Sequence, residues 1–100
     1  MSAEFEMDRY LIESPHSEKQ CLQAAQTMFA AGFLLNFEWG CEDGVHIAYA
    51  MIESENRKQA LLLVPPNLRG DARAIKLIKI DPAELESART EGRLSWVNRT

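Results

Sequence analysis

The chain of 100 residues contains only two cysteines and two histidines, and it has no long hydrophobic run. Two cysteines are too few for the disulfide framework of a small secreted domain. No apolar stretch approaches the roughly 20 residues that a transmembrane helix needs. The charged N-terminal sequence is unlike the apolar region of a signal peptide. These absences predict a cytoplasmic protein whose thiols are reduced.

The sequence also lacks an excess of positive charge. Its formal net charge is -4, and its lysines and arginines are scattered rather than clustered. Duplex nucleic acids and anionic membranes select basic surfaces, so neither is expected to be a partner. A glycine-rich phosphate loop, a Ser-His-Asp pattern and a paired CxxC motif are all missing. No common catalytic motif therefore indicates a reaction.

The length and composition are those of a single globular domain. Apolar residues make up 46% of the chain, and charged residues make up 26%. A chain of this size can bury one core without disulfides or metal ions. We expect one domain over residues 1–100, with loosely ordered tails at 1–8 and 92–100.

Four segments have the residue pattern of β-strands. These segments are Arg9–Ser14, Phe33–Cys41, Val45–Glu53 and Ala74–Ile80. The pair Asp43-Gly44 favours a two-residue turn, because both central residues of a type I′ turn need positive φ. The second and third strands are therefore predicted to form a hairpin.

Three helices are predicted between and after these strands. The first is expected from Ser17 to Gly32, the second from Glu55 to about Val64, and the third onward from Asp81. The first begins with a capping-box spacing and ends at a glycine. Two prolines stop the second, and a loop over Asn67–Asp71 follows. An aspartate followed by proline is typical of the start of the third.

The resulting order is β-α-β-β-α-β with a short C-terminal helix, the ferredoxin-like pattern of the α+β class. Right-handed crossovers place two helices on one face of a four-stranded antiparallel sheet. The other face would carry apolar residues such as Leu11, Met51 and Leu77, too many to lie in water. We therefore expect a homodimer in which a second copy covers this face.

Three segments, SPHSEKQCL, FEWGCEDGVHIAYAMIE and ALLLVPPNLR, carry a resemblance to known proteins. The chain up to about Glu91 resembles the dimeric α/β-barrel superfamily. Within it, the HxxxxC…WGC…H…VPP pattern is similar to that of a group of small uncharacterised bacterial proteins. The resemblance implies two ferredoxin-like subunits that press their sheets together. Superfamily members include isomerases, monooxygenases, haem-degrading enzymes and metal-binding proteins, so no single activity is implied.

The cysteines and histidines form two pairs of equal spacing, His16-x4-Cys21 and Cys41-x4-His46. A two-residue turn would place Cys41 directly opposite His46 on the helix-facing side of the sheet. The expected topology brings the start of the first helix to the same end of the domain. Thiolate and imidazole ligands suit Zn²⁺, Cu⁺ or Fe²⁺ better than Ca²⁺ or Mg²⁺. The leading hypothesis is a binding protein that holds a transition metal through these four residues.

Other interpretations stay open. Cys21 and Cys41 are also suited to a core, with the histidines at loop edges. In a redox sensor, Cys21 would be activated near the helix start and Cys41 would resolve it as a disulfide. In a cofactor-independent isomerase or monooxygenase, a pocket for a small hydrophobic ligand would be lined by Trp39, Tyr49 and Met28. Acidic residues near the same end could supply a general base or only a solvated rim: Glu13, Glu18, Glu38, Glu42 and Asp43.

Overall fold

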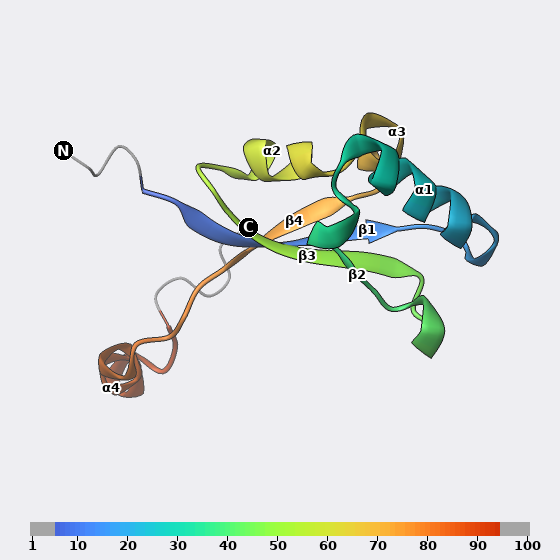
Figure 1. Cartoon of the computed structure of the whole chain (residues 1–100). Coiled ribbons are helices and arrows are strands. Elements are labelled where there is room, and N and C mark those ends of the chain that lie inside the picture. Colours follow the sequence, from blue (N-terminus) through green and yellow to red (C-terminus); the bar gives the residue numbers. More distant parts are fainter. Residues whose placement is uncertain (1–5, 95–100) are drawn as a thin grey trace.

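The computed structural model describes residues 6–94 and is an α+β fold built on an open, four-stranded antiparallel sheet (Figure 1). The strands are β1 (Asp8–Pro15), β2 (Glu38–Trp39), β3 (Ile47–Ser54) and β4 (Arg73–Leu77), in the sheet order β2-β3-β1-β4. The α-helices are α1 (Cys21–Ala31), α2 (Arg57–Ala60), α3 (Pro66–Arg69) and α4 (Pro82–Glu91). None of the helices in the described range has the length and apolar character needed to cross a bilayer.

The first three α-helices lie on one face of the sheet, whereas α4 lies apart from them on the other side (Figure 1). The core fills the space between the sheet and the three helices. Ile12 of β1 is fully buried and pairs with Ala50 of β3 and Ala74 of β4. Met28 of α1 and Val64 are also fully buried against this cluster. Because the strand alanines are small, the helices can lie close to the sheet.

The opposite face of the sheet is open and carries both apolar and charged side chains, the charged ones being Arg9, Glu13, Glu38, Glu53 and Arg73. Its apolar side chains are Leu11, Tyr49, Met51, Ile75 and Leu77. Leu11 pairs with Met51 on one side and with Ile75 on the other, and Met51 is 55% exposed. The apolar side chains expected on this face are present, among charged ones, whereas its cover by a second copy stays a prediction.

The start and end of α1 follow the capping signals in the sequence. The Ser17 backbone N–H donates to Gln20 Oε1 at 3.3 Å, and a 3₁₀ turn at Glu18–Gln20 leads into the helix. Gly32 has φ of 86° and donates its N–H to Met28 O. A residue with a Cβ is strained at this positive φ, so glycine fits the end of the helix.

The prediction of one long strand over Phe33–Cys41 was wrong. Only Glu38 and Trp39 pair with β3, and a 3₁₀ turn occupies Leu34–Asn36. The Phe33 N–H donates to Met28 O at 2.9 Å, so the helix end holds the backbone that was expected to extend. The alternation of apolar residues there was a weaker determinant than this local capping.

The second predicted helix is also shorter and starts later. Asn56, not Ser54, caps α2, because Asn56 Oδ1 accepts from the Gln59 N–H at 2.8 Å. A 3₁₀ turn at Leu61–Leu63 follows. The loop expected over Asn67–Asp71 was wrong in part, since α3 begins at Pro66 in the first helical position. A proline there removes no helical hydrogen bond.

The C-terminal helix begins as predicted. Asp81 Oδ1 accepts from the Ala83 N–H at 2.9 Å, and α4 follows with proline at its start. Strand β4 ends at Leu77, three residues before the expected Ile80. Residues 1–8 were expected to be a loosely ordered tail, but Asp8 belongs to β1 and pairs with Ser54 of β3. Residues 95–100 of the expected C-terminal tail lie outside the described range.

Candidate metal centre

Two of the four predicted ligands come from the segment that joins β1 to α1. His16 directly follows the last residue of β1, and its backbone N–H donates to His46 O at 3.0 Å. Cys21 is the first residue of α1, after the capping turn at Glu18–Gln20. One backbone hydrogen bond therefore ties the β1 end to the β2–β3 connection.

The other two ligands lie in the β2–β3 connection. Strand pairing ends at Trp39 and Ala48, and a 3₁₀ turn at Cys41–Asp43 follows Gly40. The prediction of a two-residue Asp43-Gly44 turn was therefore wrong, and so was the direct cross-strand pairing of Cys41 with His46. The longer connection closes on Gly40, whose carbonyl accepts from the Asp43 and Val45 N–H groups at 3.0 and 2.9 Å.

Glycine at position 40 has a steric reason. A Cβ built on Gly40 would lie 2.7 Å from the Val45 carbonyl oxygen. That carbonyl is backbone and cannot rotate away without moving the connection. Gly44 supplies the positive φ, 82°, that ends the 3₁₀ turn. Cys41 and His46 are thus positioned by a compact loop rather than by a regular hairpin.

The four side chains meet at one point despite this difference. The distance from His16 Nε2 to Cys21 Sγ is 3.2 Å, and that to Cys41 Sγ is 3.0 Å. Cys21 Sγ lies 3.3 Å from Cys41 Sγ and 3.3 Å from His46 Nδ1. One ligand atom from each of the four residues falls within 4.8 Å of every other. Within residues 6–94, these two histidines and two cysteines form a group arranged so that it could hold a metal ion.

The surroundings of the cluster shift the pKa of two of its members. Burial lowers the pKa of His16, the neighbouring His46 lowers it further, and the Ser14 backbone opposes the shift. The hydrogen bond to Cys41 raises the pKa of Cys21, and burial and the charges of Cys41 and Glu18 raise it further. A neutral imidazole is the form that binds metal, whereas the Cys21 thiol must release its proton on binding.

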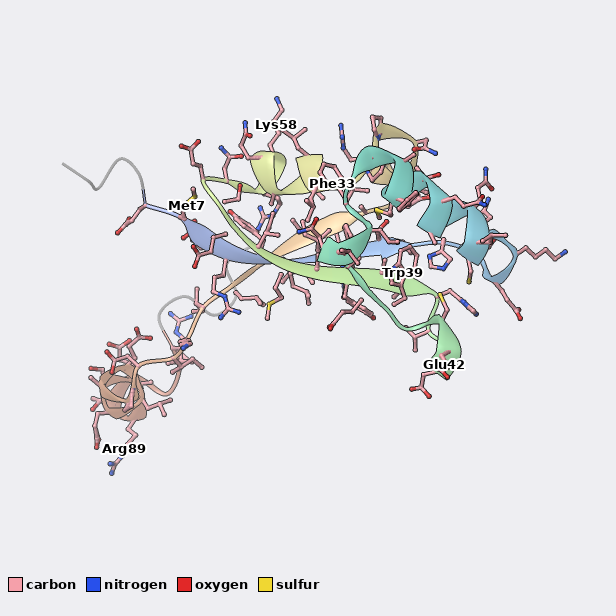
Figure 2. The ribbon with its side chains drawn as sticks, viewed as in Figure 1. Met7, Phe33, Trp39, Glu42, Lys58 and Arg89 are labelled. Atoms are coloured by element: carbon pink, nitrogen blue, oxygen red, sulfur yellow. The ribbon has the colours of Figure 1, made fainter. Side chains whose placement is uncertain are left out.

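Trp39 lies beside the cluster on the helix-covered side of the sheet, while Glu42 lies at the tip of the connection (Figure 2). The rings of His16 and Trp39 have their centroids 5.5 Å apart at an angle of 58°. The rings of His16 and His46 are 6.0 Å apart. The Trp39 indole thus lies against the His16 imidazole, whose Nε2 contacts both sulfurs.

The three residues predicted to line a hydrophobic pocket lie in different places. Met28 is fully buried in the core, and Trp39 packs at the edge of that core. Tyr49 pairs with Glu38 on the other face of the sheet and lines a shallow depression there with Leu11 and Met51. Trp39 and Tyr49 therefore do not face one common cavity.

The acidic residues near this end are spread over the surface. Glu13 forms an ion pair with Arg73 at 2.6 Å on the open face of the sheet. Glu18, Glu38 and Glu42 are exposed. No acidic residue of the described range joins the Cys/His cluster. The rim interpretation fits this placement better than a hard metal site does.

A groove that the sequence did not predict borders His16 between α1 and α3. Its polar lining residues are Ser17, Gln20, Gln23, Thr27, Asn67 and Asp71. The groove is open and polar, unlike the closed apolar cavity that the enzyme hypothesis requires. One wall of the groove comes from α3, and the sequence pattern predicted only a loop there.

Comparison with known proteins gives no match among family models, curated proteins or solved structures. The resemblance to the dimeric α/β-barrel superfamily therefore stays a prediction from the residues that carry it. What can be said of function depends on the geometry of the cluster formed by His16, Cys21, Cys41 and His46.

Proposed function

We propose that this chain binds a transition metal ion through His16 Nε2, Cys21 Sγ, Cys41 Sγ and His46 Nδ1. The observation that carries the proposal is the convergence of these four atoms, from two separate segments, within 4.8 Å of one another. Each of the four residues is half-buried, so an ion can enter and yet be partly shielded from water. If Cys21 and Cys41 were only core residues, nothing would require both histidines of the chain to lie beside them.

Zinc is the favoured ion. In a tetrahedral site with Zn–N bonds of about 2.0–2.1 Å and Zn–S bonds of about 2.3 Å, ligand atoms lie about 3.3–3.8 Å apart. Four of the six separations between the ligand atoms are 3.0–3.3 Å, and the other two are within 4.8 Å, so small side-chain movements would bring all four atoms to an ion. Cu⁺ and Fe²⁺ accept the same ligand types and are the competing ions.

The donor set favours binding over catalysis. Two sulfurs and two nitrogens would fill a tetrahedral zinc site completely, which is typical of structural sites. Catalytic zinc sites instead keep a position for water or substrate. The proposed role is therefore a binding protein whose β1–α1 and β2–β3 connections are held together by the ion.

The proposal requires that both thiols be reduced. Cys21 and Cys41 are free, and their sulfurs are 3.3 Å apart. A reducing compartment such as the cytoplasm keeps cysteines in this form. We therefore include a cytoplasmic location in the proposal.

The decisive experiment is metal analysis of the chain purified without a histidine tag. We expect about one zinc per chain in a closed four-ligand site. Adding zinc to the metal-free protein at 100 times Kd should raise the free energy of unfolding by about 2.7 kcal/mol. The variants Cys41→Ser and His46→Ala should lose both effects.

Glu42→Ala is the matched control, because Glu42 lies on the same turn as Cys41 but outside the cluster. It should bind zinc like the original chain. A metal content near zero, with no thermal stabilisation by Zn²⁺ or Cu⁺, would contradict the proposal. Equal zinc binding by Cys41→Ser and Glu42→Ala would also contradict it.

We further propose that the chain is a ferredoxin-like subunit of a homodimer. The sheet order β2-β3-β1-β4, with helices joining β1 to β2 and β3 to β4, supports that fold. The apolar side chains of half-buried Leu11 and exposed Met51 support a second copy on the open face. Sedimentation velocity should show a dimer, and the double variant Leu11→Lys, Met51→Lys should be a monomer that still binds zinc. A monomer at every concentration of the original chain would contradict the dimer alone.

A further inference from the structure

The two cysteines of the cluster are close enough to react with each other. Cys21 Sγ and Cys41 Sγ are 3.3 Å apart, although the residues are 20 positions apart in the chain. A disulfide has an S–S distance of about 2.05 Å, so an approach of roughly 1.3 Å would join them. Cys21 lies at the start of α1 and Cys41 lies in the β2–β3 connection, so the bond would cross-link the two segments that hold the cluster.

The surroundings of the sulfurs suit thiol chemistry. Both cysteines are half-buried, so a small oxidant can reach them. The Cys21 thiol donates a hydrogen bond to Cys41 Sγ, which makes Cys41 the acceptor of the pair. His16 Nε2 lies 3.2 Å from one sulfur and 3.0 Å from the other, and can take up or return a proton at either.

We propose that Cys21 and Cys41 form a reversible disulfide when a hydroperoxide oxidises them, and that this bond switches the cluster from a metal-binding state to a metal-free state. The thiol chemistry depends only on the two sulfurs and His16. The release of metal rests on the proposed function as a metal-binding protein. Under oxidising conditions the chain would therefore carry the Cys21–Cys41 disulfide and no metal.

The first step oxidises one sulfur. The Cys41 thiolate attacks an oxygen of the hydroperoxide, and the O–O bond breaks. The product is a Cys41 sulfenic acid, and the other oxygen leaves as an alcohol, or as water when the probe is H₂O₂, after taking up a proton. In the metal-free chain this is the proton that the Cys41 thiol has first passed to His16 Nε2, 3.0 Å away, to become a thiolate.

The second step forms the disulfide. The Cys21 sulfur attacks the Cys41 sulfur, the S–O bond breaks, and the hydroxyl leaves as water with the Cys21 proton. The two sulfurs together lose two electrons, and the hydroperoxide gains them. With zinc bound, two thiolates, one hydroperoxide and two protons give the disulfide, water, an alcohol or a second water, and free Zn²⁺. The zinc keeps its charge and leaves because the disulfide no longer supplies thiolate ligands.

The test treats the full chain with a small excess of H₂O₂ in metal-free form and in zinc-loaded form. Intact mass and thiol titration report the disulfide, and a chromophoric chelator reports free zinc. We expect the metal-free chain to lose two hydrogens and both free thiols. The zinc-loaded chain should release zinc in equal amount to the disulfide formed, and dithiothreitol followed by zinc should restore the original state.

Variants assign the roles of the two sulfurs. Cys21→Ser should form no intramolecular disulfide and should leave a Cys41 sulfenic acid that dimedone captures. Leu22→Ala is the matched control, because Leu22 is the next residue on α1 and is 71% exposed. It should form the disulfide as the original chain does.

Two results would overturn the inference. One is persistence of both free thiols in the metal-free chain under H₂O₂. The other is oxidation to sulfinic or sulfonic acids without a disulfide. A chain that forms the disulfide but binds no zinc beforehand would instead contradict the proposed function and leave the thiol pair supported. A chain that keeps its zinc while the disulfide forms would overturn the switch.

Discussion

The middle of β1 and its C-terminal end are stabilised by different kinds of contact. In the middle, Tyr10 and Ile12 are buried among alanines and the side chains of the helices. At the end, His16 contacts two sulfurs and the ring of Trp39, and its backbone bonds to His46. The burial of apolar side chains stabilises the fold whatever the pH or the metal present. The contacts among the sulfurs and imidazoles instead depend on the protonation and oxidation of these groups and on bound metal.

This difference implies that the fold and the cluster can be perturbed separately. The middle of β1 has neighbours on both sides, β3 and β4, along most of its length. The cluster end is formed mainly by connections between strands and helices, which open more easily than central strands. A metal ion would therefore add order where the apolar core does not reach.

The largest expected effect is from Ile12→Ala, which should lower the free energy of unfolding by about 2–5 kcal/mol. Among residues 6–94, Ile12 is one of three large residues with full burial, together with Met28 and Val64, and the alanines around it cannot fill the cavity. Chemical denaturation of the metal-free protein measures the loss. Leu22→Ala, at a site 71% exposed, is the control and should change it little.

The same variant sharpens the comparison between the two regions. If they are separate, folded Ile12→Ala should bind zinc with the affinity of the original chain, measured calorimetrically below its unfolding transition. A loss of zinc affinity as large as the loss of stability would show that the core positions the cluster directly.

The sequence predicted the four cluster residues and their meeting at one end because that conclusion depends on chain topology. The end of β1, the start of α1 and the β2–β3 connection share one end of the sheet whatever the turn type. The capping signals of Ser17 and Gly32 were also sufficient, since these act through residues near in sequence.

The local geometry of the β2–β3 connection could not be predicted in the same way. Asp43-Gly44 is a strong signal for a two-residue turn, but the contact that decides the loop is between Gly40 and the Val45 carbonyl. The lack of a Cβ at Gly40 matters only when that carbonyl is in place. The groove between α1 and α3 was missed for a similar reason, since it depends on packing between distant segments.

The next effect in size is from Gly40→Ala, which should weaken zinc binding by about 1–3 kcal/mol, the usual range for a side chain forced into a filled space. The new methyl group would lie 2.7 Å from the Val45 carbonyl and would displace the connection that carries Cys41 and His46. Competition with a zinc chelator measures the affinity. Gly70→Ala is the matched control, because a methyl group there would have no atom within 4 Å and the φ of Gly70 is negative. Equal affinities for the two variants would show that the loop adapts.

Changing the pH should alter zinc binding by about tenfold per pH unit for each proton released. The raised pKa of Cys21 keeps it a thiol below its ordinary value of 9.0, so zinc must displace a proton and affinity should rise from pH 7 to 8.5. The lowered pKa of His16 keeps its ring neutral in this window, since it titrates below its ordinary value of 6.5. Calorimetry in buffers of different ionisation enthalpy measures the protons released. A pH-independent affinity would mean that Cys21 is not a ligand.

The two shifts also define where the metal-free protein should respond to pH. Below 6.5 the unfolded chain binds a proton at residue 16 more readily than the folded chain, so stability should fall as the pH falls through this region. Above 9.0 the unfolded chain releases the Cys21 proton first, so stability should fall as the pH rises. Between these limits neither group changes the free energy of unfolding, although zinc affinity does change.

The smallest effect is expected for the ion pair between Glu13 and Arg73, on the open face near the cluster end. The pair has an N–O distance of 2.6 Å, but the Arg73 side chain is 71% exposed. Exposed pairs contribute about 0–1 kcal/mol, because water and salt screen the charges. A double-mutant cycle with Glu13→Gln and Arg73→Gln, at concentrations where the chain is monomeric, should give a coupling in this range that decreases with salt. A coupling free energy well above this range and independent of salt would mean that water is excluded from the open face within one chain. The open face would then resemble the helix-covered face more than the exposure of Arg73 indicates.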